Sequence, residues 1–303
     1  MQPNFPTSND SPGTGQLVRG AVCMVLSGLC FATMNLLIRL AGDVPTFQKS
    51  VFRNGVVLII AWIIYVRSAD YRGFRVAPSC RKSLWLRAVC GTVGLLCNFY
   101  AVDHLPIADA SVLGRLSPFF AIIFSMFILA EQVDWVQITS ILIALVGAGL
   151  VARPTFDNPN IVAYMIAIVG AVGAGAAYTY VRKLTLTGMN KHFIIFFFAA
   201  FSTVVIAPIL IFTYEPMTWR QTLLLLGAGL CAAGGQYGVT FAYSLAPAKN
   251  ISIFSYSQVI IAAILSMLVL HEFPYWLSII GYVVIFGATF VLFIHNYRAS
   301  AEA

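Results

Sequence analysis

Blocks of about twenty mostly apolar residues follow one another along nearly the whole chain, and only short polar connections separate them. A helix needs roughly 20 apolar residues to cross a hydrocarbon core of about 30 Å, because it rises about 1.5 Å per residue. The pattern therefore predicts an all-α integral membrane protein with ten transmembrane helices. The predicted spans cover residues 20–40, 51–66, 84–103, 107–129, 134–152, 160–181, 193–213, 221–244, 250–270 and 275–296.

Composition and charge fit this interpretation. Hydrophobic residues make up 60% of the chain and charged residues only 10%, whereas a soluble domain carries roughly 25% charged residues. The formal net charge is +7, but the basic residues gather in connections and at span ends, where they orient a membrane protein. We therefore expect the lipid bilayer as a partner, and no nucleic acid.

The connection between the second and third spans sets the expected orientation. It is rich in basic residues, namely Arg67, Arg72, Arg75, Arg81 and Lys82. Because such loops stay in the cytoplasm, ten spans place both termini there, in a multi-pass protein of the inner (plasma) membrane. Residues 1–18, rich in proline, serine and asparagine, are expected to be a disordered cytoplasmic tail.

The chain also contains an internal repeat. A shift of 141 residues pairs Cys90 with Cys231, Gly94 with Gly235, Ser111 with Ser252, Glu131 with Glu272 and Trp135 with Trp276. The two halves, 19–153 and 160–297, each hold five predicted spans. Because five is odd, the second half must enter the membrane with opposite polarity. Inverted five-helix repeats are typical of secondary transporters, whose two halves can alternate around a central site.

These features resemble the EamA family of the drug/metabolite transporter superfamily. The likeness covers about residues 20–296. It is carried by Arg53, by Ala-x-x-x-x-Pro at 101–106 and 242–247, and by Glu-x-x-x-Trp at 131–135 and 272–276. The resemblance implies two five-helix EamA-like repeats around a central cavity, in a family that includes exporters of amino acids and other metabolites. It leaves the cargo open, because one fold hosts many functions.

Arg115 is the sharpest candidate for the site, because a charge within a span is costly and often functional. It lies about eight residues, roughly 12 Å, into the fourth span. Pro118 removes a backbone donor and crowds the carbonyl of Gly114, which predicts a kink suited to a carboxylate or phosphate. The alternatives are that Arg115 extends to the membrane surface or pairs with Asp109, although a continuous helix would place those two about 240° apart.

Other polar residues within spans extend this candidate site. The ninth span is polar at the place equivalent to Arg115. The predicted substrate-binding residues are Arg115, Arg53, Asn35, Asn98, Gln236, Tyr256 and Gln258, with Gly114 and Pro118 at the kink. The alternative for Asn35 and Gln236 is that they only hydrogen-bond neighbouring helices. Tyr178 is expected in an interfacial aromatic belt, and the glycine runs near 170–175 and 234–238 are expected to serve helix packing.

An enzyme or a channel would need motifs that the sequence lacks, whereas a ligand receptor is disfavoured only because its helix count and duplication would be unusual. The histidines lie near span ends without HExxH spacing, and neither a filter-like loop nor a ring of acids indicates a channel. We expect no enzyme activity, cofactor or metal. The sequence predicts a secondary transporter that moves a small polar metabolite, such as an amino acid or another anionic or zwitterionic solute, by alternating access, with export preferred. The alternative is an uptake carrier or exchanger for a nucleobase, vitamin or nucleotide-like metabolite; the oligomeric state and the coupling ion stay open.

Overall fold

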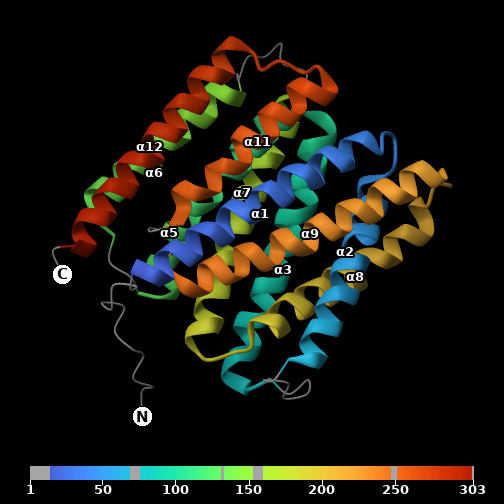
Figure 1. Cartoon of the computed structure of the whole chain (residues 1–303), viewed down its shortest axis with the longest axis horizontal. Coiled ribbons are helices and arrows are strands. Elements are labelled where there is room, and N and C mark those ends of the chain that lie inside the picture. The colour runs from blue at the N-terminus through green and yellow to red at the C-terminus, as the bar shows by residue number, and fades with distance from the viewer. Residues whose placement is uncertain (1–13, 69–75, 131–132, 153–159, 247–250, 302–303) are drawn as a thin grey trace.

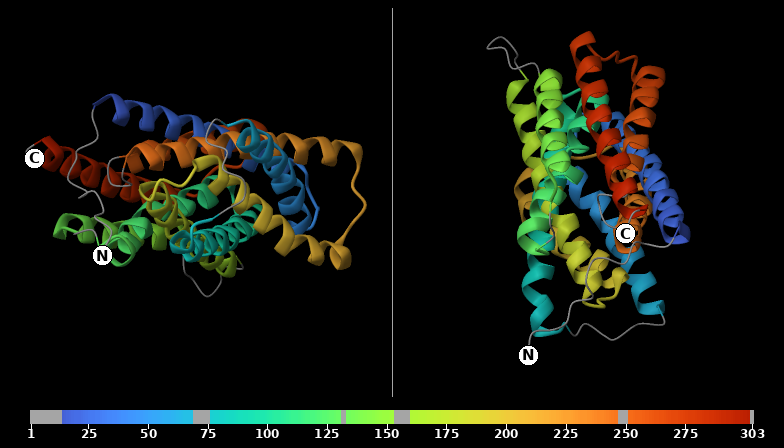
Figure 2. Two further views of the ribbon diagram at one scale, coloured as in Figure 1. Left: turned by 90° about the horizontal axis from the view of Figure 1, so that it is seen from below. Right: turned by 90° about the vertical axis from the view of Figure 1, so that its left-hand side faces the viewer.

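The computed structural model describes residues 14–68, 76–130, 133–152, 160–246 and 251–301, whose helices form one bundle (Figures 1 and 2). These residues include no strand. In chain order the elements are α1 (Thr14–Leu40), α2 (Thr46–Arg67), α3 (Pro78–His104), α4 (Ile107–Gly114), α5 (Ser117–Ile128), α6 (Trp135–Ala152), α7 (Ile161–Leu186), α8 (Lys191–Thr213), α9 (Trp219–Leu245), the 3₁₀ helix η1 (Ser252–Tyr256), α11 (Ser257–Leu265), the π-helix η2 (Ser266–Leu270) and α12 (Trp276–Ala301).

Eight helices of the described chain are long and apolar enough to cross a membrane, when α4 and α5 are counted together as Ile107–Ile128. Two shorter apolar helices, Trp135–Val151 and Phe254–Leu270, complete the series. The chain is therefore a multi-pass membrane protein. The predicted spans correspond to these segments, although several helices begin earlier or end later than the apolar blocks indicate.

Two expectations about helix starts are wrong. α1 begins at Thr14, so residues 14–18 are helical and do not belong to a disordered tail; residues 1–13 lie outside the described residues. α2 begins at Thr46, directly after Pro45, and it includes polar residues that the predicted span 51–66 left in a connection. They stay within the helix because Lys49 is buried in an ion pair with Asp103 of α3.

Four helix pairs organise the bundle: α1 packs on α9, α3 on α7, α2 on α8 and α6 on α12. Figure 1 shows α6 and α12 side by side along one edge and α2 with α8 at the opposite side. Helices that the 141-residue shift of the sequence repeat pairs with each other begin at equivalent positions. α3 and α9 have 27 residues each and begin at Pro78 and Trp219, while α6 and α12 begin at Trp135 and Trp276.

Glycines allow two of these pairs to approach closely. A Cβ atom added to Gly94 of α3 would lie 3.0 Å from the backbone nitrogen of Ala174 in α7. A Cβ atom added to Gly235 of α9 would lie 2.7 Å from the Phe31 ring of α1. Small residues at such contacts are a usual way for membrane helices to pack, which agrees with the packing role predicted for the glycine runs.

The ends of the helices meet in two separate groups. Near the end of α3, Asp103 pairs with Lys49 of α2, while at its start Cys80 lies 3.5 Å from the Thr187 hydroxyl that follows α7. A helix of this length separates the two groups by roughly 35 Å. The start of α1 and the end of α12 lie at the same end of the bundle (Figures 1 and 2).

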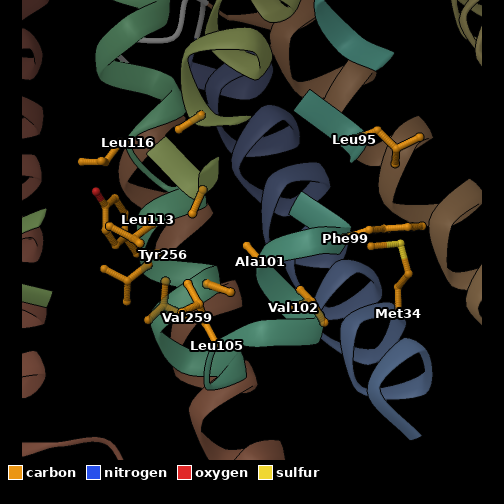
Figure 3. Close-up of a cluster of buried hydrophobic side chains, with 14 of the residues drawn as sticks. Met34, Leu95, Phe99, Ala101, Val102, Leu105, Leu113, Leu116, Tyr256 and Val259 are labelled. Carbon is orange, nitrogen blue, oxygen red and sulfur yellow. The ribbon is translucent and has the colours of Figure 1, made fainter. Parts of the chain in front are cut away.

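An apolar cluster fills the middle of the bundle. Met34, Leu95 and Phe99 form one side of it, and Leu113, Leu116 and Val259 form the other (Figure 3). Ala101 of the same cluster also lines a cavity. The core therefore positions α1, α3, α4 and α11 around that cavity.

Candidate functional site

A cavity lies between the helices of both halves. Its volume, measured as the space open to the centre of a water molecule, is about 110 Å³. One water needs roughly 10–15 Å³ by this measure, so the space can hold several waters or a small organic molecule. Side chains from α1, α2, α3, α4, α5, α7, α8, α9 and α11 line it, together with Arg115 at the α4–α5 junction.

One stripe of α3 forms a wall of this cavity. Besides Leu95, the α3 residues that line it are Arg87, Gly91, Gly94, Asn98 and Ala101. Their spacing of three or four positions places them on one helical face. Glycine and alanine keep the wall free of bulk, while arginine and asparagine bring polar groups into it.

The neighbouring helix α7 also lines the cavity. Its lining residues include Ala167, Gly170, Ala174, Ala177 and Tyr178, again at helical spacing. Because small residues lie on both helices, the two pack closely and still leave an open space beside the contact. Tyr178 closes this row, and its ring stacks on Tyr243 of α9 with 4.9 Å between centroids.

Three arginines bring positive charge into the cavity: Arg53 of α2, Arg87 of α3 and Arg115. Arg53 and Arg87 are each only 2% exposed. The Nε atom of each of the three is buried and has no hydrogen-bond partner. The ion pairs found among the described residues involve none of them. A buried charge without a partner is costly, and an anion in the cavity could supply that partner.

The local contacts of the arginines differ. Arg53 donates a hydrogen bond from Nη1 to Oδ1 of the neighbouring Asn54. The Arg87 guanidinium carbon lies 4.3 Å from the centre of the Phe198 ring, a cation–π contact. Arg115 lies where the helix breaks: α4 ends at Gly114, and α5 begins at Ser117 with Pro118 in its first turn. Arg115 and Leu116 thus form a short turn between the two helices, and the kink role of Gly114 and Pro118 stays a prediction.

Amide groups complete the polar lining. Asn35 of α1, Gln236 of α9 and Gln258 of α11 line the cavity and are all buried. Asn35 Oδ1 and Gln258 Oε1 have no hydrogen-bond partner. Gln258 can reach the cavity because α11 lies against α1 at Gly28, where an added Cβ would be 3.0 Å from the Gln258 nitrogen. The site thus offers acceptors beside the guanidinium donors.

The structure brings most of the predicted site residues together. Arg115, Arg53, Asn35, Asn98, Gln236 and Gln258 line one cavity. Tyr256 is not among the lining residues; it donates a hydrogen bond to the Arg115 carbonyl oxygen instead. Asp109, proposed as an alternative partner of Arg115, accepts hydrogen bonds from the hydroxyls of Tyr164 and Tyr282.

The expectation for Tyr178 is wrong. It was assigned to an interfacial belt because the predicted span 160–181 ends just after it. α7 continues to Leu186, however, so Tyr178 lies within the bundle and lines the cavity.

Arg87 and Phe198 are among the lining residues that the sequence pattern did not reveal. Arg87 lies three residues into the predicted span 84–103, where an arginine is easily taken for an orientation signal. Its spacing to Gly91, Gly94 and Asn98 is the signal that places it on the same helical face. Phe198 belongs to the phenylalanine-rich start of α8, where the sequence does not separate cavity-lining from lipid-facing rings.

A polar network links helix ends where α1 and α3 end. Arg39 pairs with Glu272 at 3.0 Å and also donates to the carbonyls of Val102 and Asp103. Glu272 also accepts from the Ser266 hydroxyl at 3.0 Å. This network connects the two sequence halves. Glu131, the equivalent of Glu272, lies outside the described residues.

Within the described part of the chain, no group of three or more His, Cys, Asp or Glu side chains could hold a metal ion. The chemistry of the cavity is therefore that of guanidinium, amide and aromatic groups. It can hold an anion and orient hydrogen-bonding groups beside it.

Comparisons with known proteins relate this chain to membrane transporters. The sequence model of the EamA-like transporter family matches residues 18–153 and again residues 161–294. The pseudopaline exporter CntI of Pseudomonas aeruginosa (strain UCBPP-PA14) is 30% identical over 278 residues, which cover 91% of this chain and 96% of the exporter. Solute carrier family 35 member G1 of Homo sapiens is 24% identical over 86% of this chain and 75% of that protein. A solved crystal structure covers 92% of this chain and 98% of its own, with a TM-score of 0.67 and 18% identity, and so shares the fold.

Proposed function

This chain belongs to the EamA-like transporter family, and from that premise we propose that it is a secondary transporter that exports a small anionic or zwitterionic metabolite across the inner membrane. The observation that carries the proposal is the set of arginines in the central cavity. Arg53, Arg87 and Arg115 line it with Nε donors that lack a partner. A carboxylate on the cargo would supply that partner, since guanidinium and carboxylate form strong paired hydrogen bonds.

The amide groups narrow down which chemical groups the proposed cargo would carry. Asn35 Oδ1 and Gln258 Oε1 face the same site as acceptors without a donor. A cargo that carries an ammonium, amide or hydroxyl group beside its acid would satisfy them. An amino acid or a related organic acid has this combination, whereas an apolar solute would leave all these groups unpaired, at a cost of roughly 1–3 kcal/mol each.

The proposed topology is ten spans in two inverted halves, with both termini in the cytoplasm. It is supported by the two separate matches of the family model and by the equivalent starts of α3 and α9 and of α6 and α12. The two shorter apolar helices are 17 residues long, which is at the lower limit for a span. The helix ends also group as this topology requires, because α1, α3 and η2 all end at the network around Arg39 and Glu272.

Alternating access would then require this network to open. In the described conformation, Arg39 of the first half is bound to Glu272 of the second. Under the proposed topology this is the outer face, so release of an exported cargo would separate the pair. Export is favoured over import because a relative that covers 91% of this chain is an exporter.

The proposal is tested with the purified protein in proteoliposomes. A thermal-shift screen against amino acids, organic acids and nucleobases first selects a radiolabelled cargo, and counterflow then measures its transport. We expect carboxylate counterflow by the wild-type protein and its loss in Arg115→Ala, with Arg67→Ala, an exposed arginine at the end of α2, as the matched control. Carboxylate counterflow by Arg115→Ala at the wild-type rate, or protection by nucleobases alone, would reject the proposal.

A further inference from the structure

The arginines of the cavity carry more positive charge than a single carboxylate can neutralise. All three come from the first half: Arg53 from α2, Arg87 from α3 and Arg115 from the α4–α5 junction. At the shift of the sequence repeat, their equivalents are Ile194, Ala228 and Tyr256. The charge thus comes from one sequence half of an otherwise repeated arrangement.

The surroundings do not compensate this charge. Among the described residues that line the cavity there is no aspartate or glutamate, so no carboxylate of the lining neutralises the three guanidinium groups. Like charges in a low-dielectric interior repel each other strongly.

Two of these arginines are held in place without an anion. Arg87 lies over the Phe198 ring, and Arg53 is bonded to Asn54. Neither contact neutralises a charge, but both hold a guanidinium group at the cavity wall. A site with fixed, uncompensated cations gains most from a ligand that brings several negative charges at once, because each additional pair is formed without further ordering of the protein.

We propose that the cargo carries at least two acidic groups, and that Arg87 acts with Arg53 to select such an anion over its singly acidic analogue. This inference rests on the proposed transport function and specifies the substrate class of the same cavity. The shared chemistry is an organic anion with two or more negative charges, from either carboxylates or a phosphate ester. The amide acceptors that also line the cavity could bind a donor group of the same cargo.

Matched probe pairs test the selection. Succinate is compared with succinamate, and glutamate with glutamine, because each pair differs by one carboxylate-to-amide change at nearly constant shape. Glycerol 3-phosphate, compared with glycerol, distinguishes a phosphate source from a carboxylate source. Binding to the purified wild-type protein is measured by titration calorimetry at constant ionic strength, independently of transport.

We expect the more acidic member of at least one pair to bind at least tenfold tighter. Arg87→Gln should reduce that ratio severalfold, and Arg87→Lys, which keeps the charge, should retain most of it. Arg81→Gln removes an exposed arginine from the same helix and should leave the ratio unchanged. Thermal unfolding of each variant establishes that it is folded.

The inference is overturned if the less acidic member of every pair binds equally well, if none of the probes binds, or if Arg87→Gln leaves the ratio at its wild-type value. These outcomes are separate from those for transport. Counterflow of a singly acidic cargo with no acid preference would keep the proposed function and reject this inference. Conversely, an acid preference that depends on Arg87, found in a protein without any flux, would keep this inference and reject the proposed function.

Discussion

The Tyr256 hydroxyl donates a hydrogen bond of 3.3 Å to the carbonyl oxygen of Arg115, a residue 141 positions earlier in the chain. This separation is the shift of the sequence repeat, so equivalent residues of the two halves touch. Both lie where a helix is interrupted: Arg115 follows the end of α4, and Tyr256 ends η1. The bond satisfies a carbonyl at the break and fixes the backbone from which the Arg115 side chain enters the cavity.

Tyr256→Phe removes this bond and keeps the ring, which packs edge-to-face against Phe286 at 5.9 Å. We expect a loss of about 1 kcal/mol in the free energy of unfolding and a severalfold weaker cargo affinity, because Arg115 is less well positioned. Thermal unfolding and binding titration measure both. Tyr214→Phe, at an exposed tyrosine after α8, is the control. Wild-type affinity in Tyr256→Phe would show that the bond does not position Arg115.

Because Gly91 has no side chain, the Arg87 guanidinium group has room beside it. A Cβ atom at this position would lie 2.2 Å from Arg87 Nη1 and 2.9 Å from the Phe198 ring. Gly91→Ala should therefore displace the guanidinium and weaken cargo binding about tenfold. Folding should be kept, because the end of an arginine side chain can move.

Gly149→Ala, in α6, is the matched control for this substitution, since an added Cβ there meets nothing within 4 Å. Both variants are compared by binding titration. Equal affinities for the two would contradict the assigned position of Arg87.

The α3–α7 contact predicts a different outcome at Gly94. An added Cβ would lie 3.0 Å from the Ala174 nitrogen and 3.1 Å from the Gly170 carbonyl oxygen, and these backbone atoms cannot turn away. Gly94→Ala should lower the free energy of unfolding by about 1–3 kcal/mol, as overpacking does. Gly55→Ala, which faces open space in α2, should have little effect. The comparison uses thermal unfolding in detergent, and equal stability would show that the helices are not in contact here.

Glu272→Gln should loosen the end of the bundle that Arg39 helps to close. The pair is partly exposed, so its contribution is about 1 kcal/mol or less, or up to roughly fivefold in the population of the open form. A cysteine placed at Ala101 in a chain without its native cysteines reports this opening through its rate of thiol labelling. We expect faster labelling in Glu272→Gln.

Glu215→Gln is the control for the labelling experiment, because only the backbone of Glu215 bonds Gln48. A labelling rate unaffected by Glu272→Gln would mean that the ion pair does not control access to the cavity.

Much of the fold could be predicted from the sequence because the bilayer allows few solutions. An apolar block long enough to span the core must be helical, so the positions of the helices follow from hydropathy. The break in the fourth span could also be predicted, because Pro118 cannot donate to the carbonyl of Gly114. Helix starts were harder. The first turn of α2 is polar, and it is stabilised by an ion pair from Lys49 to α3 that no local pattern indicates.

The candidate site was predicted in part. Arg115 and Gln258 were found because polar residues interrupt apolar blocks, and the repeat related the two interruptions. Arg87 was missed because basic residues near span ends usually report orientation, and only tertiary packing shows that this one lies within the bundle. The binding roles of these residues stay predictions until cargo is measured.

Alternating access in this protein depends most on the opposite orientation of the two halves. His104 and Leu245 end α3 and α9 and are equivalent under the shift of the repeat. Each can be replaced singly by cysteine in a chain whose native cysteines have been removed, and then labelled in intact cells with a thiol reagent that does not cross the membrane. We predict labelling of the cysteine at position 104 from outside, and labelling at position 245 only after the cells are opened. Labelling of both positions from the same side would contradict two inverted halves and the alternating carrier built from them.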